Sequence, residues 1–100
     1  MQIGRHKRQK SEIISPHRHV PVKVEQRGAS QEVLYIEYGR VKITFFGDDN
    51  RSIEQKELVA GDLILLIQGG HSFEFLDETE MIEIKQGPYN PDSTQRFEEK

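Results

Sequence analysis

Short stretches of alternating apolar and polar residues, separated by turn signals, run through most of this sequence. Residues 32–38 (EVLYIEY) and 40–46 (RVKITFF) are rich in β-branched and aromatic side chains and meet at Gly39, which predicts a tight hairpin. Further strands are expected at residues 13–19, 52–58, 63–67, 71–76 and 81–86. No segment keeps a helical period over the length of a helix. The pattern therefore predicts an all-β sandwich or small barrel.

The run LILLI at residues 63–67 is the most apolar of the chain. Strands that are buried on both faces show such continuous apolar runs, because neither face meets water. We therefore expect this segment to form a central strand of its sheet.

The length and composition of the chain bound what it can be. Residues 1–100 are expected to form one domain, with its core between about residues 11 and 86. The sequence has no cysteine, which excludes disulfides, thiolate metal ligands and cysteine nucleophiles. No run approaches the roughly 18 apolar residues of a membrane span, and the first ten residues lack the apolar centre of a secretory signal. These features predict a cytoplasmic protein with no membrane contact.

Charge is distributed unevenly. The first 28 residues hold seven Lys or Arg against two Glu, although the whole chain has a net charge of -3. This basic segment has no aromatic residue on which bases could stack, so we expect no nucleic-acid partner. It is expected to be a solvated terminus, with His6 facing water, and Arg96 and Phe97 are expected to form a loose tail at the other end.

Four polar residues fall on faces of the expected strands that should point into the core. The period of two places Glu32 with Leu34 and Ile36, and His71 with Phe73 and Phe75, while His17 and His19 share one face of residues 13–19. A carboxylate on a core-facing position is costly unless it is paired, hydrogen-bonded or bound to a cation. Three imidazoles beside it would offer such a setting if a cation were bound.

These residues resemble the motifs of the cupins. His17 and His19 match the His-x-His pair of the first cupin motif, and Glu32 precedes Gly39 by the spacing that this motif uses. The segment GDLILLIQGGH, residues 61–71, is similar to the second motif. The resemblance covers residues 11 to 86. It implies a double-stranded β-helix, also called a jelly-roll barrel, and the metal ligands His17, His19, Glu32 and His71.

The chain departs from the first motif after its second histidine. Twelve residues, 20–31, separate His19 from Glu32, where the family usually has only a few. Glu25 lies inside this insertion and is an alternative ligand, but only Glu32 has both the spacing to Gly39 and the core-facing phase. The ending EIKQGPYNP is similar to that of small cupins linked to surface-polysaccharide and sugar-nucleotide metabolism.

Three imidazoles and one carboxylate suit a divalent transition metal ion, namely zinc, iron, manganese, nickel or copper, and leave coordination positions open. Without a metal, Glu32 would instead form a salt bridge with Arg18 or Arg40. Three functions stay open: a metal-binding cupin that acts on or binds a small polar molecule such as a sugar derivative, a sensory ligand-binding cupin without catalysis, or a metal-free sugar-nucleotide isomerase or epimerase. In the last, His71 or His17 would be the base and Tyr35 the acid.

Apolar residues are also expected on the outer faces of several strands. Val33 and Tyr35 stand opposite to Glu32, and Phe46, Ile64 and Leu66 are assigned to the same outer side. A chain that is 34% hydrophobic and 31% charged gains from covering such a face. We expect a homodimer packed sheet to sheet or with exchanged terminal strands.

Overall fold

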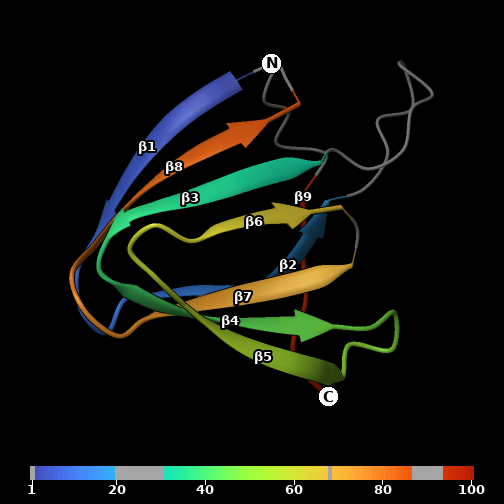
Figure 1. Ribbon diagram of the computed structural model, residues 1–100. Helices are drawn as coiled ribbons and strands as arrows, with labels where there is room; N and C mark the ends of the chain where they lie inside the picture. Colours follow the sequence, from blue (N-terminus) through green and yellow to red (C-terminus); the bar gives the residue numbers. More distant parts are fainter. Residues whose placement is uncertain (1, 20–30, 68, 87–93) are drawn as a thin grey trace.

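The chain folds into two antiparallel β-sheets that face each other (Figure 1). The computed structural model describes residues 2–19, 31–67, 69–86 and 94–100, and these contain nine strands and no helix. One sheet has the order β1 (Gln2–Arg8), β8 (Thr79–Lys85), β3 (Glu32–Tyr38), β6 (Leu63–Leu66). The other has the order β5 (Ser52–Val59), β4 (Arg40–Phe46), β7 (Gly70–Phe75), β2 (Ile13–His19), β9 (Thr94–Arg96). The predicted all-β jelly-roll fold is confirmed.

The hydrophobic core lies between the inner faces of the two sheets. Alternate side chains of β3, β4, β7 and β8 point inward, as the period of two requires. The buried apolar cluster consists of Leu34, Ile36, Val41, Ile43, Leu66, Phe73, Phe75 and Met81. This core fills one part of the space between the sheets, and the polar residues considered below fill another.

The connection at Gly39 is a corner between the sheets, and the predicted hairpin is wrong. β3 and β4 belong to different sheets and are not paired. A single residue between two strands is too short for the two-residue loop of a hairpin. Gly39 has a φ of 101°, and a Cβ atom there would lie 2.4 Å from the carbonyl oxygen of Glu78. The corner therefore requires glycine for both its conformation and its space.

The segment LILLI does not form a central strand, contrary to expectation. β6 lies at the edge of its sheet, beside β3. The pairing of Leu34 with Ile64 and of Glu32 with Leu66 turns Ile64 and Leu66 inward. Leu63 and Leu65, 64% and 49% exposed, stand on the outer face instead. The assignment of Ile64 and Leu66 to the outer face was therefore wrong, because the alternation of inward and outward residues is offset by one position.

Both ends of the chain contribute strands, which corrects the expected solvated terminus and loose tail. β1 pairs with β8 from Gln2 opposite Lys85 to Arg8 opposite Thr79. β9 pairs with β2, and the following Phe97 packs edge to face on Phe46 with 5.3 Å between the ring centroids. Phe46 is thus covered by the chain itself.

The described part of the chain contains no helix of the length and hydropathy that a membrane span needs.

Candidate metal centre

Three histidines meet between the sheets. β2 and β7 are antiparallel neighbours, and their register sets His17 directly opposite His71. His19 follows two residues later on the same face of β2, as the period of two predicts. One ring nitrogen from each of the three histidines lies within 4.8 Å of the others. Such a cluster is compact enough for all three imidazoles to bind one ion.

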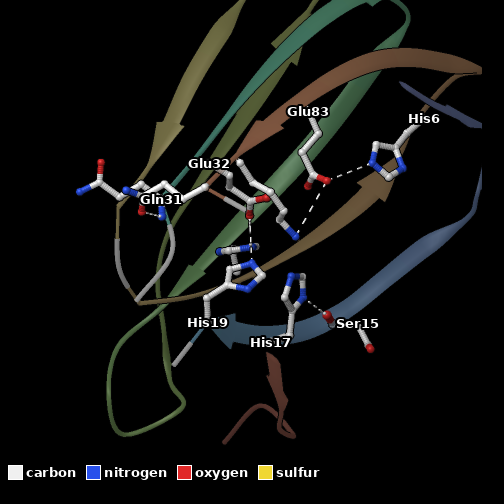
Figure 2. A network of polar contacts seen from close by, with 10 residues as sticks. His6, Ser15, His17, His19, Gln31, Glu32 and Glu83 are labelled. Atoms are coloured by element: carbon white, nitrogen blue, oxygen red, sulfur yellow. Dashed lines mark hydrogen bonds and ion pairs between the residues drawn. The ribbon is translucent and has the colours of Figure 1, made fainter. Parts of the chain in front are cut away.

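Glu32 reaches this cluster from the opposite sheet, at the start of β3 (Figure 2). Its Oε1 lies 3.2 Å from Nε2 of His19 and 3.3 Å from Nε2 of His71. Glu32 is only 3% exposed. The structure thus brings together the four residues that the sequence singled out, whereas Glu25 lies outside the described residues.

The orientation of His17 is set by the backbone. Its Nδ1 lies 2.9 Å from the carbonyl oxygen of Ser15 (Figure 2). A carbonyl oxygen only accepts hydrogen bonds, so Nδ1 carries the proton and Nε2 keeps its lone pair. A hydrogen bond of this kind from the second ring nitrogen is typical of metal-binding histidines.

The cluster shifts the protonation of two of its members. Burial, assisted by the neighbouring imidazoles of His71 and His19, lowers the pKa of His17 to about 4. Burial would raise the pKa of Glu32, but close polar contacts with His19, His71 and Glu83 outweigh this effect and hold that pKa far below its ordinary range. Near pH 7 the site thus presents a neutral His17 and a charged Glu32, the forms that bind metal ions.

Two buried atoms of the cluster have no hydrogen-bond partner within the described chain. They are Oε2 of Glu32 and Nε2 of His71, because the 3.3 Å approach of His71 to Oε1 of Glu32 lacks the angles of a hydrogen bond. Unpartnered buried polar atoms are rare in folded proteins and indicate a role such as ion binding. The residues present therefore fit a bound cation.

Solved structures with the same architecture include enzymes and binding proteins. Oxalate decarboxylase from Bacillus subtilis superimposes with a TM-score of 0.70 at 22% identity, over 94% of this chain and 23% of that one. The capsular polysaccharide assembling protein CapF from Staphylococcus aureus gives 0.73 at 16% identity, over 97% of this chain and 26% of that one. The chain has the cupin fold.

Proteins other than these two also share the fold. Drosophila melanogaster CENP-C, in a structure bound to CAL1, superimposes with a TM-score of 0.64 at 15% identity, over 84% of this chain and 60% of that one. The chain spans about a quarter of the length of the oxalate decarboxylase chains and of CapF. No family model and no curated protein matches its sequence.

His17, His19 and Glu32 form part of the wall of a cavity of about 510 Å³. Its other polar lining residues were not predicted from the sequence: Gln2, His6, Arg8, Glu83, Lys85, Thr94 and Arg96. His6, expected to face water, lies with its Nε2 3.3 Å from Oε1 of Glu83 (Figure 2). Glu83 could have been predicted from the sequence. It lies two residues after Met81 and so on the same inward face of its strand, as Glu32 lies on the face of Leu34. β1 gave no such signal, because every inward position in it is polar or glycine.

Neither the salt bridges expected for Glu32 without a metal nor the expected pairing of Tyr35 with a histidine is formed in the described residues. Arg18 donates to the carbonyl oxygen of Gly47 and to Oδ1 of Asn50, and Arg40 pairs with Asp77 and Glu57, so neither arginine pairs with Glu32. Tyr35 is 39% exposed on the outer face of β3, whereas the histidines point inward. Tyr35 therefore cannot act as the acid beside His17 or His71, and that pairing was wrong.

Proposed function

We propose that this chain is a metal-binding cupin in which His17, His19, Glu32 and His71 hold one divalent transition metal ion. The observation that carries the proposal is the buried carboxylate of Glu32 among three imidazoles, with Oε2 unpartnered. One oxygen and three nitrogen ligands suit zinc, iron, manganese, nickel or copper. When bound in such a site, the ion would supply a Lewis acid with open positions for water or a ligand.

The ligand that we propose is a small polar molecule. A cavity of about 510 Å³ lies within the range of small-molecule sites. A carbohydrate-related ligand is supported by the likeness to CapF, the capsular polysaccharide assembling protein, and by the similar ending of the sequence. The likeness to CENP-C bound to CAL1 favours, as the alternative, a non-catalytic module whose ligand state alters a partner. A cytoplasmic location remains a prediction.

The same side chains also fit a simple division of roles around a bound molecule. The four proposed ligands would hold the ion beside the cavity, while Ser15 fixes the ring of His17. Ile14, Phe73 and Met81 supply an apolar part of the cavity wall. His6 and Glu83 stand on the wall formed by the other sheet, where they can orient a polar group.

Metal analysis tests this proposal. We expect one ion per purified chain and its loss when His17 and His19 are both replaced by alanine. A folded chain that carries no metal and binds none on titration would contradict the proposal.

We also propose a homodimer that packs through the outer face of the β1–β8–β3–β6 sheet. The strand register aligns Ile3, Ile84, Val33 and Leu65 in one row across all four strands. Around this row, the outer face carries further exposed apolar side chains, namely Tyr35, Leu63 and Ile67. An exposed apolar face of this extent is uncommon on a monomer, and a second copy related by two-fold symmetry would present the same surface.

A further inference from the structure

The cavity beside the proposed metal centre is rich in cationic side chains, although the whole chain has a net charge of -3. Arg8, Lys85 and Arg96 line it, from three different strands. Only Glu32 and Glu83 oppose them among its lining residues. A divalent ion at the histidines would make the cavity more positive still. Its electrostatics therefore favour an anionic ligand.

The three cations are not equivalent. Arg8 has its Nη1 3.3 Å from Oε2 of Glu12, and Lys85 has its Nζ 4.0 Å from Oε1 of Glu83. Arg96 donates to the hydroxyl oxygen of Ser15 at 3.3 Å, and no carboxylate within the described ranges pairs with it. In this part of the chain, Arg96 is thus the cavity cation with the most capacity left to bind an anion.

Strand pairing places Arg96 beside the histidine cluster. In the β2–β9 register, Arg96 lies opposite His17, and Thr94 lies opposite His19. Directly opposed residues on neighbouring antiparallel strands share a face, with Cβ atoms roughly 5 Å apart. The guanidinium therefore extends from the same face of the sheet as the imidazoles and can contact a molecule that is bound at them.

The short strand β9 is held in place by the residue that follows it. The amide of Phe97 donates to the carbonyl oxygen of Pro16 at 3.2 Å, and the guanidinium carbon of Arg18 lies 4.4 Å from the centroid of the Phe97 ring. The ring also lies against Gly70, where a Cβ atom would come within 2.5 Å of it. Arg96 thus extends from an anchored strand, which limits the entropy that it loses when it binds a ligand.

We propose that Arg96 recognises a carboxylate or phosphate group of a small anionic ligand that occupies the cavity next to the metal centre. The location rests on the proposed function, but the charge recognition belongs to Arg96 itself. A planar guanidinium offers two parallel N–H donors, which match the paired oxygens of either group. The ligand class is accordingly a small acid, such as a sugar acid, a dicarboxylate or a phosphorylated sugar.

Titration calorimetry on the full chain tests the proposal with malonate, inorganic phosphate and neutral glycerol as probes. Each protein is used metal-free and after loading with Co²⁺, and its metal content is measured in the same samples. The variants are Arg96→Gln, Arg96→Lys and, as a control of equal charge change, Arg51→Gln. Arg51 is exposed, pairs with Asp49 and lies outside the cavity lining.

We expect at least one of the two anions to bind the wild type and Arg51→Gln alike, and to bind Arg96→Gln about tenfold or more weakly. Arg96→Lys should recover only part of the affinity, because lysine keeps the positive charge but lacks the two parallel N–H donors of the guanidinium. The tighter anion identifies the carboxylate or the phosphate as the recognised group. Glycerol should show no dependence on Arg96.

Two results would overturn the inference: neither anion binds the wild type, or the anion affinity of Arg96→Gln stays within about twofold of the wild type. The metal measurement separates this outcome from failure of the proposed function. Stoichiometric Co²⁺ with no effect of Arg96 would remove the inference and leave the metal site. Anion binding that depends on Arg96 in a chain that takes up no Co²⁺ would remove the metal site and leave the inference.

Discussion

Glu32 is the residue on which the site depends. It is a charged side chain at a core position, 3% exposed, and the sheet register fixes it opposite Leu66 and Lys85. The described part of the chain gives it imidazoles as partners and no arginine. Because a buried carboxylate without a full set of partners costs several kcal/mol, its retention at this position is best explained by a bound cation.

The protonation of His17 gives a prediction for the metal-free protein. Unfolded His17 takes up a proton near pH 6.5, whereas in the folded state it does so only near pH 4. Between these values the unfolded state binds more protons, so the free energy of unfolding falls as the pH falls from about 6.5 to about 4. The loss from His17 should reach up to about 3 kcal/mol, while above pH 6.5 its contribution stays constant.

Urea unfolding at several pH values checks this, with His17→Gln as the comparison. The variant should lose most of the dependence of stability on pH between 4 and 6.5. An equal dependence in both proteins would show that His17 is not responsible.

At the scale of strands, the sequence predicts the elements that form the core and misses β1 and β9, which line the cavity. β3 and β7 alternate apolar with polar residues, and their inward residues were assigned correctly, including Glu32 and His71. β1 turns Gln2, His6 and Arg8 inward, where they meet a polar cavity, so no alternation marks it as a strand. β9 has only three residues, too few for any periodic signal.

The corner at Gly39 provides a prediction on stability, with Gly61 as a matched control. Both glycines have positive φ, 101° and 93°, but a Cβ at Gly39 would meet backbone atoms of residues 78 and 79, whereas at Gly61 it would meet nothing within 4 Å. Gly61→Ala should cost about 1 kcal/mol from backbone strain alone. Gly39→Ala should cost about 3 kcal/mol or more, since overpacking adds to the strain.

Thermal and denaturant unfolding of the two variants measure these costs. Equal destabilisation of Gly39→Ala and Gly61→Ala would show that the close packing of the corner on β8 does not matter.

For the whole molecule, the two sheets have different outer surfaces. The outer face of the β1–β8–β3–β6 sheet is apolar over one end, whereas the exposed strand β5 of the other sheet is mostly polar and charged. β6 is apolar throughout because Ile64 and Leu66 face the core, whereas Leu63 and Leu65 belong to this outer face. The proposed dimer would cover it and leave the cavity, on the inner side of the same sheet, open to small molecules.

The dimer is tested by Leu63→Glu combined with Leu65→Glu, both outward on β6 and at least 49% exposed. We expect light scattering after size exclusion to give a dimer for the wild type and a monomer for the variant, because two carboxylates would be buried in the interface. Ile53→Glu, at a position 72% exposed on β5, should remain a dimer. A wild-type chain that is monomeric at micromolar concentration would contradict the proposal.

The central claim, a metal ion held by three histidines and Glu32, is tested most directly by elemental analysis of protein purified without an affinity tag. The comparison is between the wild type, the double variant His17→Ala with His19→Ala, and His6→Ala, which removes a cavity histidine outside the cluster. Circular dichroism confirms that each variant is folded. We predict about one transition metal ion per chain in the wild type and in His6→Ala, and a loss of at least tenfold in the double variant. Metal-free wild type that also fails to take up added Zn²⁺ or Mn²⁺, or equal metal content in all three proteins, would contradict the account.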